Sequence, residues 1–126
     1  MKTKWNKSWK SSKQPRKQRK YNYNAPLHIA RKMMSVRLSK DLKTKYNKRN
    51  IPVRRNDKVK VIKGQFKGKT GVVSEVDIKH RKVYVDGAHT LKRDGNKLPY
   101  GIYPSNLMIV ELNMEDKLRK EVLERK

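Results

Sequence analysis

The one-sided charge of its N-terminal third is what most constrains how this sequence can fold. Residues 1–40 carry 13 Lys and Arg and no carboxylate, and the first acid is Asp41. The whole chain of 126 residues has a formal net charge of +24. So much like charge opposes a compact state unless a polyanion neutralises it, and nucleic acid or an anionic membrane would do so. No apolar run approaches the about 20 residues that span a bilayer, so we expect a nucleic-acid partner and no membrane insertion.

The basic N-terminal segment contains aromatic residues among its cations. Residues 11–20 are almost entirely polar, cannot bury enough surface to offset their conformational entropy, and are therefore predicted to be disordered in isolation. Aromatic rings there suit stacking on unpaired bases, while Lys and Arg contact phosphates. The alternative is a solvated tail with its rings packed against the protein. We expect RNA contacts from Trp5, Trp9, Lys13, Gln14, Arg16, Lys17, Arg19 and Lys20, and further along from Arg31 and Lys32.

Two short helices are predicted after this segment. Asn24-Ala25-Pro26 places a capping residue, Asn24, and a proline near a helix start. Apolar residues at helical spacing follow, which are Leu27, Ala30, Met33 and Met34. Ser39 is the predicted N-cap of a second helix, with Asp41 in its first turn, where the helix dipole favours a carboxylate. Leu38, Leu42 and Tyr46 share a face that we expect to anchor these helices on the main domain.

From Ile51 the apolar period changes to two, which indicates short strands. Strands are expected around Val59 and Val61, over 72–76, and over 83–85, where Asp86-Gly87 predicts a tight turn. Further strands are expected at 88–91 and 106–112, and a helix over 114–125, with Asn113 as cap and Leu118 and Val122 on one face. This pattern predicts a mostly β chain, with a basic extension over 1–50, a small bent barrel over 51–112 and a C-terminal helix over 113–126.

A loop rich in glycine and lysine, residues 63–71, follows the strand at Val59–Val61. Its glycines, Gly64, Gly68 and Gly71, allow sharp turns and close approach of the backbone to RNA. Its lysines, Lys63, Lys67 and Lys69, are then placed to meet phosphates. Phe66 can either stack on a base or close the mouth of the barrel, and we favour the second.

The loop and its flanking strands, residues 56–73, resemble a KOW motif, which forms part of an SH3-like barrel. Together with residues 13–20, 24–28, 38–42 and 103–109, they make the chain resemble the KOW-containing ribosomal protein twenty-four family of the large subunit, in its archaeal and eukaryotic form. Two departures are Asn56, where the family often has glycine, and Tyr103, where it often has histidine. Asn tolerates a left-handed backbone better than most residues, so we expect the turn at Asn56 to survive.

This resemblance implies a structural role in the large ribosomal subunit. It implies binding to the 5′ part of large-subunit rRNA, action early in assembly, and a place on the solvent side near the polypeptide exit tunnel. Neighbouring ribosomal proteins are implied partners, and targeting or translocation factors at the tunnel exit are candidates. The cytoplasm, on the ribosome, is the expected compartment, which agrees with the absence of Cys.

Other classes of function find little support. His28, His80 and His89 are far apart in the sequence, and there is no Cys, so we expect no metal site, no cofactor and no enzymatic activity. The Gly-Lys-Thr at 68–70 lacks the spacing of a phosphate-binding loop. A KOW-type transcription or chromatin factor is the main alternative, although such a factor would not normally carry a long basic arm. An SH3-type adaptor is a third class, for which a charge of +24 is hard to explain.

Overall fold

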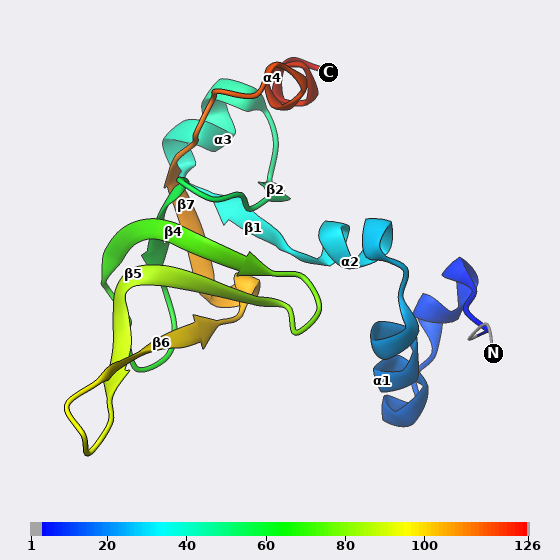
Figure 1. Cartoon of the computed structure of the whole chain (residues 1–126). Helices are drawn as coiled ribbons and strands as arrows, with labels where there is room; N and C mark the ends of the chain where they lie inside the picture. The colour runs from blue at the N-terminus through cyan, green and yellow to red at the C-terminus, as the bar shows by residue number, and fades with distance from the viewer. Residues whose placement is uncertain (1–3, 126) are drawn as a thin grey trace.

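A computed structural model describes residues 4–125, so the first three residues of the predicted extension and Lys126 lie outside the described range. Seven strands form one sheet in the order β2-β1-β7-β3-β4-β5-β6, and the sheet curls strongly (Figure 1). The strands are β1 (Ser35–Leu38), β2 (Asn50–Pro52), β3 (Lys58–Val61), β4 (Thr70–Asp77), β5 (Lys82–Leu91), β6 (Lys97–Ile102) and β7 (Leu107–Glu111). Neighbouring strands are antiparallel except β1 and β7, which are parallel.

The core lies on the inner face of this curl. Alternate residues of each strand point to the same face, so Val59 and Val61 are buried while Lys60 between them is exposed. Val36, Leu38, Val73, Val83, Leu107 and Ile109 complete the centre of the core from the other strands. The predicted strands at 58–61, 72–76 and 106–112 are therefore confirmed as β3, β4 and β7, with ends shifted by one or two residues.

Two of the helices agree with the sequence prediction. Helix α2 (Leu27–Met33) buries Ala30, and Met34 at its end lies in the core. Helix α3 (Lys40–Tyr46) begins after Ser39, whose hydroxyl oxygen accepts the N–H of Leu42 at 3.4 Å, with Asp41 in the first turn. Leu42 and Tyr46 pack against the core as expected. Asn24 does not cap α2, because it is the last residue of the preceding helix.

The N-terminal segment is more ordered than predicted. A short 3-10 helix η1 (Lys7–Ser11) precedes helix α1 (Pro15–Asn24), which occupies most of the segment predicted to be disordered. Pro15 at the first position is preorganised for a helix, and the Arg, Lys and Gln residues that follow have high helix propensity. The sequence did not predict this helix, because a single buried residue, Tyr21, among charged and polar ones gives no apolar periodicity.

The predicted tight turn at Asp86-Gly87 is wrong. Strand β5 continues from 82 through 91, and Gly87, at φ +86°, lies where the pairing register of β5 with β6 shifts between Tyr84 and His89. The hairpin instead turns at residues 92–96, where Lys92 donates its N–H to the Asn96 carbonyl at 3.0 Å. An Asp-Gly pair serves a β-bulge as well as a turn, because both require a positive φ at glycine.

Strand β1 enlarges the sheet beyond its predicted range of 51–112. It comes from the part of the chain predicted as an extension, and Arg37 and Leu38 pair with Met108 and Ile109 of β7. The η2 turn (Pro104–Asn106) leads into β7. The extension is therefore joined to the sheet through its own strand.

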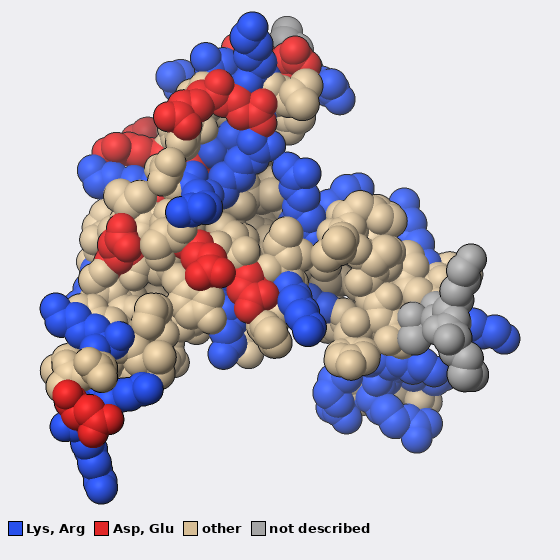
Figure 2. Space-filling model, viewed as in Figure 1, with Lys and Arg blue, Asp and Glu red and all other residues tan. Residues whose placement is uncertain are grey.

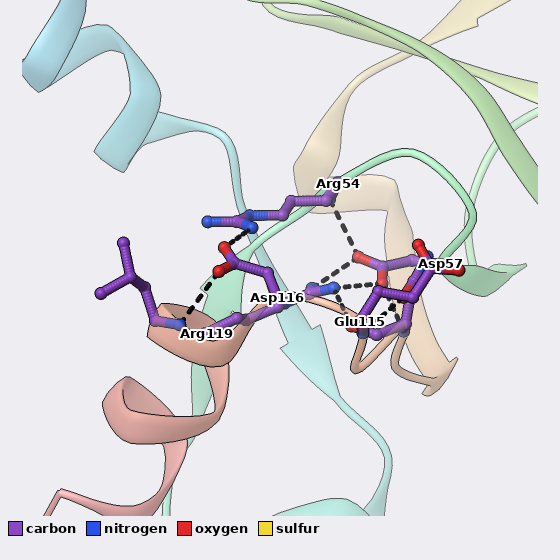
Figure 3. A network of polar contacts seen from close by, with 7 residues as sticks. Arg54, Asp57, Glu115, Asp116 and Arg119 are labelled. Atoms are coloured by element: carbon purple, nitrogen blue, oxygen red, sulfur yellow. Dashed lines mark hydrogen bonds and ion pairs between the residues drawn. The ribbon is translucent and has the colours of Figure 1, made fainter.

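The C-terminal helix α4 (Lys117–Glu124) is held by a buried ion pair (Figure 3). Both guanidinium ends of Arg119 donate to the two carboxylate oxygens of Asp57 at 2.6 Å, and both side chains are almost fully buried. Asp57 also accepts the backbone N–H groups of Arg54 and Asn113, each at 2.9 Å. This network ties α4 to the turn before β3, where Asn56 has the left-handed φ of +66° expected for it.

The expected cap and face of this helix are corrected by the structure. Asp116 is the N-cap, accepting the N–H of Leu118, and it also pairs with Arg54. Leu123 and Arg119 form the buried face, whereas Leu118 and Val122 are exposed. An apolar pattern cannot indicate a face whose central residue is a buried arginine.

Candidate nucleic-acid interface

The loop between β3 and β4 presents three lysines on a tightly turned backbone. Gly64 and Gly68 have φ values of +99° and +90°, and a methyl group added at either would meet nothing within 4 Å. Glycine is therefore required by the backbone conformation there, and the outer side of the loop is open. Backbone hydrogen bonds close the loop, such as the N–H of Gly68 to the Val61 carbonyl at 2.9 Å. Exposed on this frame are Lys63, Lys67 and Lys69.

Gly71 has a different role from the one predicted. It lies in β4, and a Cβ at this position would be 2.4 Å from the Asp86 carbonyl oxygen and 2.8 Å from a Val85 methyl group. The missing side chain thus allows β4 and β5 of the same sheet to approach each other, rather than allowing approach to RNA.

Phe66 packs into the core at this end of the curled sheet, which agrees with the role that we favoured over base stacking. Its ring is buried in the core cluster and lies 5.1 Å from the ring of Tyr100, centre to centre. The Lys69 ammonium group lies 5.1 Å from the centre of the Phe66 ring. Base stacking on Phe66 is thereby restricted, and the accessible aromatic groups nearby are Tyr100 and Tyr103.

The arm, residues 4–24, is a small unit of its own. Trp5 packs on Tyr21 with ring centres 5.2 Å apart, and its indole N–H donates to the Tyr21 carbonyl at 3.1 Å. Trp9 is exposed, and with Lys17, Lys20 and Tyr21 it lines a hollow of about 370 Å³. The predicted contact residues of α1 and its entry are all exposed, namely Lys13, Gln14, Arg16, Lys17, Arg19 and Lys20, as are Arg31 and Lys32 of α2.

The turn between β4 and β5 joins the arm to the sheet and adds cations that the sequence interpretation missed. Arg81, at φ +56°, donates to the backbone carbonyl of Asn22 at the end of α1. Arg19, Lys79 and Arg81 line a basic cleft of about 610 Å³ between the two parts. The polar run at 79–82 was a visible signal, but its proximity to Arg19 depends on how the arm folds back.

Charge is unevenly distributed over the surface. The arm carries Lys and Arg without carboxylates, whereas the acids lie on the rest of the molecule, with several of them near α4 (Figure 2). Ion pairs within residues 4–125 engage Arg54, Lys58 and Arg119, together with His80, and none of the arm's cations. The arm thus combines unpaired cations with an absence of acids, so its charge is not compensated within residues 4–125.

Two carboxylates have pKa values shifted by local contacts. Hydrogen bonds from His80, first from its backbone N–H, lower the pKa of Asp77 below 3.8. The side-chain hydrogen bond from Arg54 lowers the pKa of Asp116 below 3.8. Both contacts are structural, and both lie away from the loop lysines.

Neither a metal-binding cluster nor a membrane-spanning helix is present among the described residues. Within residues 4–125, no three His, Asp or Glu side chains gather closely enough to hold a metal ion. In the same range, no helix has the length and apolar character needed to cross a membrane.

Comparison with known proteins identifies the family. A family model described as the ribosomal proteins L26 of eukaryotes and L24 of archaea matches residues 12–126. A large ribosomal subunit protein uL24 from Methanosphaera stadtmanae is 50% identical over 115 residues, which cover 91% of this chain and 98% of the relative. These matches confirm the family resemblance drawn from the five sequence segments. The chain belongs to the family of eukaryotic L26 and archaeal L24 ribosomal proteins, which are structural proteins and not enzymes.

Proposed function

We propose that this protein is a structural constituent of the large ribosomal subunit and binds large-subunit rRNA through its arm and its β3–β4 loop. The observation that carries the proposal is the exposed, uncompensated charge of the arm, on a chain that belongs to a ribosomal protein family. A cationic surface without carboxylates gains binding free energy by releasing counterions from a polyanion.

The curled sheet is proposed to be an SH3-like barrel of the KOW type. Support comes from its short, strongly bent strands and from the glycine-lysine loop at 63–71, which resembles the KOW motif. We retain the division at 50 and 113 into extension, barrel and C-terminal helix as part of this proposal, with β1 as the strand that the extension contributes to the sheet.

Two surfaces are proposed to contact RNA in different ways. The loop offers Lys63, Lys67 and Lys69 to phosphates, on a backbone left open at Gly64 and Gly68. The arm offers Trp9 for stacking and a cluster of cations, while Trp5 serves chiefly to pack the arm. Because most of these groups meet phosphates, shape rather than base sequence would determine specificity. The arm residues in this proposal are Trp5, Trp9, Lys13, Gln14, Arg16, Lys17, Arg19 and Lys20, with Arg31 and Lys32 of α2.

The position of the protein within the subunit is proposed from the family resemblance. We infer binding to the 5′ part of the rRNA early in assembly, and a place near the polypeptide exit tunnel of cytoplasmic ribosomes. Neighbouring ribosomal proteins, and targeting or translocation factors at the exit, are the proposed protein partners. The alternative of a KOW-type transcription factor gains no support from the family match.

Co-sedimentation and equilibrium binding test the proposal. A tagged full chain should sediment with the large subunit at moderate salt and bind a transcript of the rRNA 5′ region. If about ten cations contact phosphate, log affinity should fall with log salt at a slope of about −7 to −9. Sedimentation with RNA polymerase, and loss from the large subunit at moderate salt, would show that the ribosomal proposal is wrong.

A further inference from the structure

A groove of about 420 Å³ lies between the β3–β4 loop and strand β6. Lys63 and Phe66 line it from the loop, Lys82 from β5, and Tyr100 and Tyr103 from β6 and the residue after it. Its volume falls in the range of about 300–1,000 Å³ typical of pockets for small organic groups. One nucleotide fits such a space, whereas a double helix is far too wide.

The aromatic wall of the groove is only partly covered, and one of its two tyrosines is packed against a buried ring. Side chains alternate along β6, so Tyr100 shares a face with the buried Ile102 and rests on the buried Phe66. Even so, Tyr100 is 41% exposed, and Tyr103 is 55% exposed. A tyrosine such as Tyr100, fixed at one side and open at the other, provides a stacking surface at a low entropic cost, and Tyr103 adds a second exposed ring.

The charge of the groove favours an anion. Two lysines and no carboxylate are among its lining residues. The stem of Lys82 lies across Gly101, since a Cβ added to this glycine would be 2.6 Å from the Lys82 Cδ. The absence of a side chain at Gly101 therefore allows Lys82 to lie along the groove. Gln65 and Thr90 add side-chain hydrogen-bonding groups to the same walls.

We propose that this groove binds an unpaired nucleotide of the rRNA, whose base stacks on Tyr103 and Tyr100 and whose phosphates contact Lys63 and Lys82. This inference rests on the proposed rRNA binding and adds to it a specific site for single-stranded RNA. A protein strand pairing with the free edge of β6 is the competing occupant. Pro99 disfavours it, because proline has no N–H and interrupts the row of donors that edge pairing needs.

Matched variants of the full chain test the stacking contact. Affinity for the 5′-region transcript is measured over a salt series for the wild type, Tyr103→Ala and Tyr103→Phe. We expect Tyr103→Ala to lower the affinity at least about fivefold, which is the lower end of the effect of removing one base–aromatic stacking contact. The salt slope should stay unchanged, because no charge is removed. Tyr103→Phe keeps the ring and should bind like the wild type. Lys82→Ala should instead reduce the slope by about 0.7, as for one phosphate contact on a single strand.

Crosslinking of the unchanged chain gives a readout that does not depend on how a variant folds. Transcripts carrying 4-thiouridine are irradiated in the complex, and crosslinked peptides are identified by mass spectrometry. We expect crosslinks within residues 98–103 from unpaired uridines. Failure of the wild type to bind the transcript would overturn the proposed function itself. Three results would instead refute only the nucleotide site in the groove, with the transcript still bound normally. They are equal affinity of the wild type, Tyr103→Ala and Tyr103→Phe, no crosslink at 98–103, and a crosslink there only to protein in assembled subunits.

Discussion

Replacing Arg119 by Met should break the network that holds α4 on the sheet. Arg119 donates to both oxygens of Asp57 and to the Asn113 carbonyl at 2.8 Å, so its loss leaves a buried carboxylate without a counter-charge. Removing one partner of a buried ion pair costs about 3–5 kcal/mol. Asp57 keeps two backbone N–H donors at 2.9 Å, so we expect the lower end, about 3 kcal/mol. This would be a large share of the 5–15 kcal/mol typical of whole domains.

Urea denaturation followed by far-ultraviolet circular dichroism measures this loss. The matched control is Lys120→Met, which makes a similar change at the neighbouring exposed residue and should alter the free energy of unfolding by no more than about 0.5 kcal/mol. The double variant Asp57→Asn with Arg119→Met should lose less than the sum of the two single changes, because no charge remains buried. A loss below about 1 kcal/mol for Arg119→Met, or an equal loss for Lys120→Met, would refute the assigned role of the pair.

Three other predictions concern the arm, the sheet and acid stability. Deleting residues 1–20 removes nine Lys and Arg and should weaken the salt dependence of rRNA binding without changing the melting of the sheet; an unchanged slope would mean that the arm does not touch RNA. Gly71→Ala should destabilise the fold by about 2–3 kcal/mol, because its methyl group meets the Asp86 carbonyl oxygen. Gly68→Ala should cost about 1 kcal/mol, because only its positive φ disfavours a side chain. Equal losses of stability in thermal melts would contradict these two roles. Because Arg54 depresses the pKa of Asp116, this carboxylate stabilises the fold above its unfolded pKa, and the contribution is lost as pH falls through the folded pKa. Asp116→Asn should therefore lose less stability than the wild type between about pH 5 and pH 3, and parallel acid melts would refute the link.

Local signals in the sequence were enough for much of the fold. Alternating Val and Lys at 58–61 specify a half-buried strand whatever lies beside it. Ser39 and Asp41 set the start of α3 through interactions within one helical turn. The loop glycines at 64 and 68 likewise reflect a backbone requirement of their own segment. In each case the controlling interaction lies within a few residues, so the sequence pattern is sufficient.

The features that sequence reasoning missed depend on contacts between distant residues. Strand β1 is recognisable only beside β7, about 70 residues later in the chain. The same holds for Gly71, whose role is set by Asp86 on the opposite strand. From the sequence, Arg119 would be taken for a solvent-exposed charge, because its partner Asp57 is 62 residues away in the chain. At the candidate site, Arg81 and Lys79 join Arg19 only because the arm folds back on the β4–β5 turn.

The way the few acids are used explains how a chain of charge +24 can fold and still bind a polyanion. Asp57, Glu111 and Asp116 pair with Arg119, Lys58 and Arg54, all near the junction of α4 with the sheet. These three acids therefore offset repulsion where α4 packs on the sheet, whereas the cations of the arm have no ion pair within residues 4–125. RNA contact at the arm and loop would gain the full counterion release, whereas contact at α4 would first bring carboxylates against phosphates. It follows that the α4 end should face away from the rRNA.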